Sequence, residues 1–137
     1  MRLLLALFSF YILFSSSIYA DSLVDIKRLF LKKDQESQIL VKYSQYKKKF
    51  TLRWTLYTNE GLVVFSSYNK RVFQHVLYLN TTNQSFKIYL KTKGSDLHET
   101  PYLLVKFQEF DLKEHKVRFK IFLSDAKDQI KLEYPKK

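Results

Sequence analysis

Cysteine is absent from the 137 residues of the chain. An exported domain of this size without cysteine cannot be a disulfide scaffold, and it has no thiol to carry the lipid of a bacterial lipoprotein. Its stability must therefore come from a packed core. The residues are 46% hydrophobic and 17% aromatic, a composition that is typical of a folded globule and not of a disordered chain.

Glycine and proline are almost as scarce, with two residues of each. Phosphate-cradling loops and nucleophile elbows need several glycines at fixed spacing, and neither motif occurs. The three histidines, His75, His98 and His115, are far apart and form no HxH or HExxH pattern. Such spacing does not indicate a zinc site. We therefore predict no enzymatic activity, no metal and no cofactor.

Acidic residues are outnumbered by basic residues, 13 against 24, which leaves a formal net charge of +11. A charge of this size favours polyanionic partners such as nucleic acid, lipopolysaccharide or an anionic membrane surface. Composition drift offers a second explanation. Codons for Lys, Phe, Tyr and Asn are all AT-rich, so a low-GC genome raises these residues together without selecting a binding site.

The long hydrophobic run is confined to residues 1–20. Arg2 precedes an apolar segment, and a stretch of small residues then ends at Ala20. This order predicts a cleaved signal peptide, a mature chain of residues 21–137 and a periplasmic or secreted location. An uncleaved anchor is the alternative, although three consecutive serines, Ser15 to Ser17, make this segment a poor membrane span.

Residues 21–33 show a different spacing of apolar side chains. Leu23, Ile26 and Phe30 recur at helical intervals, and Lys32 and Lys33 would fall in the last turn. The pattern predicts a short amphipathic helix that covers one end or edge of a sheet.

From residue 38 onward the apolar residues alternate with polar ones, as in half-buried β-strands. Residues 48–79 show this most clearly and predict a three-stranded meander with Trp54 buried. We expect Gly61 to adopt a positive φ in the first turn of the meander. Asn69 and Lys70 should form the second turn.

The alternation continues to residue 134, with a predicted bulge near Gln108 and Glu109. Turns interrupt it at intervals of eight to twelve residues, a spacing typical of antiparallel all-β domains. We predict a single domain that forms a two-sheet sandwich of about eight strands, with a small barrel as the alternative.

Basic and aromatic residues occur together at the outward positions of several predicted strands. If the strands are neighbours, these residues form a cationic plate with aromatic rings, suited to single-stranded nucleic acid or a phosphorylated glycan. Outward Lys and Arg side chains also protect sheet edges from aggregation, which is the simpler explanation. The candidate binding residues are Arg53, Tyr57, Lys87, Tyr89, Lys91, Arg118 and Lys120.

The longest break between predicted strands, residues 93–101, is the loop where we expect a binding function. With no catalytic motif, the chain is interpreted as a small exported, non-enzymatic binding or structural protein of the bacterial envelope with an envelope protein as partner. Its composition and leader resemble those of small exported proteins from AT-rich Gram-negative bacteria. A polyanion-binding module is the alternative, and the oligomeric state does not follow from the sequence.

Overall fold

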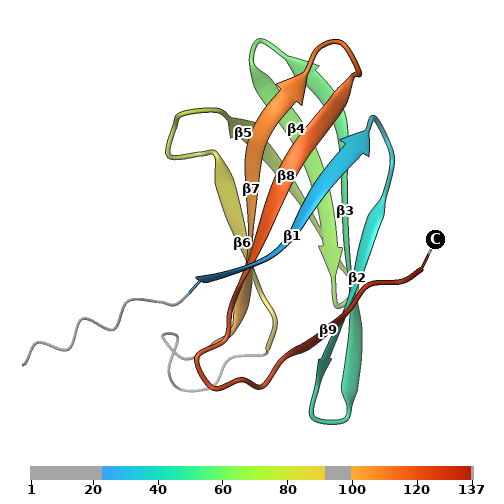
Figure 1. Cartoon of the computed structure of the whole chain (residues 1–137), viewed down its shortest axis with the longest axis vertical. Helices are drawn as coiled ribbons and strands as arrows, with labels where there is room; N and C mark the ends of the chain where they lie inside the picture. The colour runs from blue at the N-terminus through green and yellow to red at the C-terminus, as the bar shows by residue number, and fades with distance from the viewer. Residues whose placement is uncertain (1–22, 92–99, 137) are drawn as a thin grey trace, which may run out of the picture.

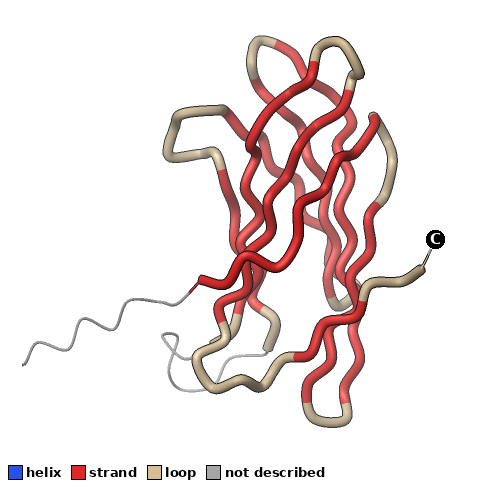
Figure 2. The backbone as a smooth tube through the Cα atoms, viewed as in Figure 1, coloured by secondary structure: helices blue, strands red, loops and turns tan. Residues whose placement is uncertain are grey.

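A computed structural model describes residues 23–91 and 100–136, and in these ranges all regular structure is β-strand (Figures 1 and 2). The nine strands form two antiparallel sheets, one of four strands and one of five. No helix of the length and apolarity needed to cross a membrane occurs in these ranges. The predicted leader, residues 1–20, lies outside the described residues.

Sheet A contains four strands in the order β1-β8-β7-β6. Its chain directions alternate, and the first strand pairs with a strand about ninety residues later. The strands are β1 (Leu23–Lys32), β6 (Ser85–Tyr89), β7 (Tyr102–Asp111) and β8 (Lys116–Ser124).

Sheet B contains five strands in the order β5-β4-β3-β2-β9, so it holds the predicted meander at its centre and edge. The short last strand pairs only with β2. The strands are β2 (Ser37–Tyr43), β3 (Tyr46–Thr58), β4 (Gly61–Tyr68), β5 (Arg71–Tyr78) and β9 (Lys131–Glu133).

The predicted two-sheet sandwich is confirmed, since the sheets pack face to face and do not close into a barrel. Strands β5 and β6 lie at one side of the sandwich, while β1 lies at the other side near β2 (Figure 1). Each sheet therefore keeps two edge strands and one outer face exposed to solvent.

The helix predicted for residues 21–33 is wrong, because residues 23–32 form β1 and pair with β8 along its whole length. Leu29 and Leu31 are buried at 7% and 4% exposure, whereas Phe30 between them is 55% exposed. Alternate burial of this kind is the signature of a strand. The hydrogen bonds and apolar contacts offered by β8 outweigh the weak helical preference of a short segment.

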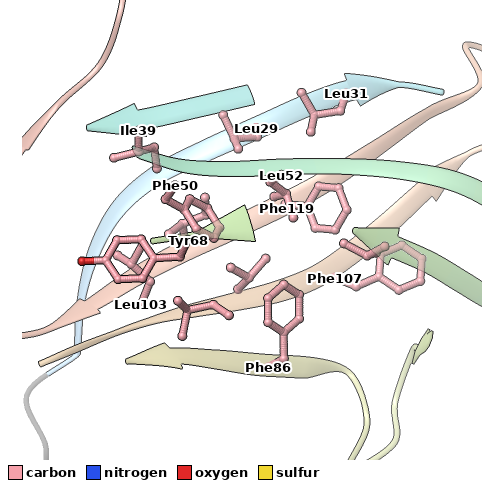
Figure 3. Packing of buried hydrophobic residues seen from close by; sticks show 14 of the residues in the cluster. Leu29, Leu31, Ile39, Phe50, Leu52, Tyr68, Phe86, Leu103, Phe107 and Phe119 are labelled. Carbon is pink, nitrogen blue, oxygen red and sulfur yellow. The ribbon is translucent and has the colours of Figure 1, made fainter. Parts of the chain in front are cut away.

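The core lies between the sheets and consists of their inward aliphatic and aromatic side chains (Figure 3). Two buried hydrogen bonds also link the sheets. As predicted, Trp54 is buried; its Nε1 donates to the Leu31 carbonyl at 2.7 Å. The Tyr68 hydroxyl donates to the Leu90 carbonyl at 2.6 Å.

The predicted turn conformation at Gly61 is wrong, because its φ is not positive. Asn59 and Glu60 occupy the left-handed region instead, with φ values of 49° and 65°. They form a two-residue hairpin turn closed by the Thr58–Gly61 pair. Glycine is needed for a different reason: a Cβ on Gly61 would lie 3.0 Å from the Tyr78 ring.

The second turn of the meander is as predicted. Asn69 and Lys70 adopt φ values of 51° and 64°, and Tyr68 pairs with Arg71 directly outside them. The bulge expected near Gln108 and Glu109 is also confirmed, since the register between β7 and β8 shifts at this point.

Candidate anion-binding surface

The outer face of sheet A carries most of the basic side chains that strand pairing brings together. Inward and outward positions alternate along its strands, and the register places seven outward Lys and Arg residues over four adjacent strands. Three acidic residues, Asp25, Glu109 and Asp111, share this surface. We call the seven cations the basic face: Arg28, Lys32, Lys87, Lys106, Lys116, Arg118 and Lys120.

One row of the basic face places three cations directly opposite each other. Arg28 on β1 pairs with Lys120 on β8, which in turn pairs with Lys106 on β7. The carboxylate of Asp25 lies 3.2 Å from Lys120 Nζ and 4.0 Å from Arg28. No acidic group of the described residues lies within ion-pair distance of Lys106. Like charges in direct register lower the stability of a sheet.

Aromatic rings stand beside several of these cations. The Arg118 guanidinium lies 5.0 Å from the centre of the Phe30 ring, and Lys87 Nζ lies 4.6 Å from that of Tyr102. Tyr89 meets Tyr102 edge to face, with 5.8 Å between ring centres. These rings hold the cations in place. Phe30 and Tyr89, which are 55% and 49% exposed, also provide surfaces on which sugars or bases can stack.

The acidic residues neutralise only part of the charge. Arg118 lies 3.4 Å from Glu109, and Asp25 is shared between Lys120 and Arg28. The ion pairs that these groups form are all solvent-exposed or half-buried, so water and salt screen them. An anionic ligand that replaces water on this face would meet an excess of positive charge.

A groove continues the basic face around the free edge of β6. It lies between β6 and the turn that joins β4 to β5, and its volume is about 720 Å³. Of the described residues that line it, none is acidic and four are cations: Lys48, Arg71, Lys87 and Lys91. Because Lys87 and Tyr89 border both surfaces, a chain-like ligand can pass from the face into the groove.

The wall of the groove is held by a buried tyrosine. Tyr68 lines the groove, and its hydroxyl donates to Leu90 on the other sheet. Burial raises the pKa of Tyr68 well above its ordinary value, with a smaller contribution from Tyr43. The hydroxyl therefore stays protonated and keeps β4 attached to the end of β6.

His75 lies in the seam between the two sheets, beside the groove. Its ring stacks on Phe86 with 3.8 Å between centres, and its Nε2 atom is buried without a hydrogen-bond partner. Burial lowers the pKa of His75. This environment fits a neutral packing residue.

The structure places the seven predicted binding residues in different environments. Lys87 and Tyr89 on β6 share the outer face of sheet A with Arg118 and Lys120 on β8. Lys91 follows β6 and lines the groove.

The other two predicted residues lie elsewhere. Arg53 stands on the opposite outer face, that of sheet B, where its guanidinium lies 5.3 Å from the centre of the Phe65 ring. Tyr57 does not point outward. A bulge between Trp54 and Leu56 reverses the alternation, so Tyr57 stacks on Phe110 between the sheets at 4.1 Å. These residues therefore do not form one plate with β6 and β8.

Several predictions concern residues that the structure does not describe. The expected binding loop, residues 93–101, falls mostly in the undescribed range 92–99, as does His98. His115 lies in the exposed β7–β8 turn with a φ of 50°. In the described ranges, no three His, Asp or Glu residues are close enough to hold a metal ion.

Sequence reasoning missed six cations of this surface: Arg28, Lys32, Lys48, Arg71, Lys106 and Lys116. Arg28 and Lys32 were hidden because their segment was assigned to a helix. The alternation of Leu29 and Leu31 with Phe30 and Lys32 was the signal for a strand with these cations outward. Lys48 and Arg71 join the groove only through the packing of the sheets, which no local pattern reveals.

Comparison with known proteins identifies no relative: no family model, no curated protein and no solved structure matches the chain.

Proposed function

We propose that the protein is an exported, non-enzymatic binding protein whose basic face and adjoining groove hold a polymer that bears phosphate groups. The observation that supports this most is the row Arg28, Lys120 and Lys106, in which cations face each other across three strands. Such a row lowers stability in the free protein. A bound polyanion reverses this effect, because it interacts with all three charges.

The neighbouring geometry supports an extended ligand. Cations are distributed over β1, β8, β7 and β6 and continue into the groove, a path suited to successive phosphates. Tyr89 adds an exposed ring, while the buried Tyr102 ring packs against Lys87 and Tyr89. Cationic tracts with interspersed rings are the usual means of binding single-stranded nucleic acid, and phosphorylated glycans present the same two features.

Export favours a phosphorylated envelope component as the natural ligand, and the predicted leader is the basis for that location. The envelope protein partner expected from the sequence stays a prediction alongside it. Both readings describe a protein that binds without changing its ligand covalently.

The proposal is tested by equilibrium binding to fluorescent single-stranded DNA, to phosphorylated lipopolysaccharide and to its dephosphorylated form. Affinity should fall steeply as salt rises from about 50 to 200 mM, since binding releases counterions. The three ligands distinguish nucleic acid from phosphorylated glycolipid. The proposal would be disproved if the affinity for each of the three ligands were the same and did not change over this salt range.

A matched pair of triple variants locates the surface. Lys87→Ala, Lys106→Ala and Lys120→Ala together should lower the log–log salt slope for single-stranded DNA by about 2, at about 0.7 per lost phosphate contact. Lys49→Ala, Arg53→Ala and Lys131→Ala remove the same charge from sheet B and should leave the slope nearly unchanged. Equal losses in both variants would mean that net charge, and not this face, determines binding.

A further inference from the structure

Strand β5 is an edge of sheet B with open backbone groups. Among the described residues it pairs with β4 alone, and the Tyr78 N–H donates to the Asn83 carbonyl on the side away from β4. Hydrogen-bonding direction alternates along an antiparallel strand. The Tyr78 N–H therefore shares its direction, away from β4, with the backbone N–H and C=O groups of Val72, Gln74 and Val76.

The four edge strands of the described chain differ in how they are protected against pairing. β1 contains a bulge at residues 25–27 and several cations, and β6 is five residues long with Lys87 at its centre. β9 has three residues and precedes Pro135. Short length, bulges, lysine and proline are the usual devices that prevent edge-to-edge association. β5 has none of them along residues 72–78.

The side chains at this open edge are uncharged and partly apolar. Val72 is 73% exposed and Val76 is 42% exposed. In the register of the sheet, Val76 lies beside Val63, which lies beside Leu56, itself 48% exposed. An apolar stripe thus crosses three strands and ends at the open edge of β5.

We propose that two copies of the protein associate by antiparallel pairing of their β5 strands about Gln74. The two-fold axis places Gln74 opposite its counterpart and Val72 opposite Val76, so this segment is complementary to itself. Each free N–H and C=O of these three residues then meets a partner across the axis. The apolar stripe of one copy continues onto Val72 of the other.

Two copies repel each other less at the β5 edge than elsewhere on their surfaces. The chain carries a net charge of +11, so most of its surface repels another copy. Residues 72–78 contain no Lys, Arg, Asp or Glu, and burial lowers the pKa of His75. Along the paired strands, the flanking cations are the two Arg71 residues, which are separated by roughly 20 Å at about 3.4 Å per residue, well beyond the Debye length of about 8 Å.

The pairing joins the two copies of sheet B side by side. It leaves the basic face on the outer side of each sheet A exposed, although Arg71 and Phe73 of β5 also line the adjoining groove. The tests of the pairing use no ligand, so a failure of anion binding does not affect them.

The absence of cysteine allows a direct test of the register. Gln74→Cys places two thiols opposite each other with Cα atoms about 5.5 Å apart, within the range of about 4.4–6.8 Å that disulfides use. Mild oxidation should give a covalent dimer. Val72→Cys is the matched control at the same edge, because its counterpart would lie roughly 14 Å away along the strand. The Val72→Cys variant should stay uncrosslinked, although Val72 is 73% exposed.

Sedimentation over a wide concentration range provides the second test. Gln74→Lys brings two cations together at the axis and should weaken the dimer by about tenfold or more. Leu56→Lys lies two strands from the edge and should leave the dimer intact. Buried Trp54 provides a fluorescence check that each variant is folded.

Three results would overturn the pairing. The wild-type protein could stay monomeric up to near-millimolar concentration. Val72→Cys could crosslink as readily as Gln74→Cys. Alternatively, Leu56→Lys could dissociate the dimer while Gln74→Lys does not, which would indicate that the copies stack through the faces of sheet B.

Discussion

The outer face of sheet A and the β4–β5 part of the outer face of sheet B are built on the same two-residue alternation but differ in charge. The outer face of sheet A holds seven cations in register over four strands. The eight outward positions of β4 and β5 in sheet B hold no charged residue: Gly61, Val63, Phe65, Ser67, Val72, Gln74, Val76 and Tyr78. Both faces cover the same core, so core packing does not explain the difference. The difference lies in the surface residues that each strand presents to solvent.

The largest change in stability is expected when a bulky side chain is placed at Gly61 on sheet B, compared with one at Ser85 on sheet A. Gly61→Val on sheet B places a Cβ 3.0 Å from the Tyr78 ring, which must move, and should lower the free energy of unfolding by about 1–3 kcal/mol. Ser85→Val at the edge of sheet A should cost less than about 0.5 kcal/mol. Urea denaturation followed by Trp54 fluorescence measures both.

A double variant identifies the cause of the Gly61 effect. Tyr78→Ala clears the space above Gly61, so Gly61→Val should cost much less in that background. Persistence of the full cost would mean that backbone strain, and not the ring, excludes a side chain at this position.

The next effect concerns the seam where the two sheets meet. Burial lowers the pKa of His75, so the unfolded chain binds its proton more readily than the folded chain. Stability associated with this residue is present above about pH 6.5 and falls as the pH decreases below that value. His75→Phe should remove this part of the pH dependence and raise stability at neutral pH by about 1 kcal/mol, because the unpartnered Nε2 is lost.

His75→Gln separates the two contributions. It removes the titrating group but keeps a buried polar side chain, so the pH dependence should decrease without the gain at neutral pH. Unfolding measured at several pH values would contradict this account if His75→Phe retained the full acid sensitivity of the wild-type protein.

Removing one cation from each face should change the stability by a smaller amount, with opposite signs on the two sheets. Lys106→Gln relieves the row of like charges on sheet A and should raise stability by about 0.2–1 kcal/mol. Arg53→Gln on sheet B removes a cation from the Phe65 ring and should lower stability by about 0.5 kcal/mol. Thermal unfolding at low salt measures both changes. If Lys106→Gln destabilised the protein, the row would not be a source of repulsion.

The smallest effect should appear in ligand affinity. Glu109→Gln releases Arg118 from its 3.4 Å ion pair and should tighten polyanion binding about twofold, the scale of an exposed ion pair. Glu133→Gln removes an acidic group from sheet B and should leave affinity unchanged. Titration of both variants with the same DNA at fixed salt makes the comparison. Equal gains would show that the ligand responds to total charge alone.

Most of the strand pattern could be predicted because alternation is local. Val117, Phe119 and Ile121 are buried and the residues between them point outward, as the sequence indicates. Prediction failed where a bulge changed the phase. In β1, a shift between Asp25 and Lys27 spaces the apolar residues like a helix. In β3, the shift after Trp54 turns Tyr57 inward.

The candidate site was predictable only in part, for a related reason. The outward positions of Lys87, Tyr89, Arg118 and Lys120 follow from alternation in their own strands. Their common location on sheet A does not, because alternation within one strand does not show that β7 lies between β6 and β8. Arg28 lies 78 residues before Lys106 and 92 before Lys120, and only strand pairing brings the three cations together.

The sequence by itself determined which side chains face the core wherever the alternation is not broken by a bulge, since a strand repeats every two residues whatever its neighbours are. It also determined the absence of disulfides and the excess of positive charge. Only the tertiary structure decided which strands are neighbours. Strand order depends on contacts between distant segments, and those contacts turn scattered cations into one basic face and leave β5 as an unprotected edge.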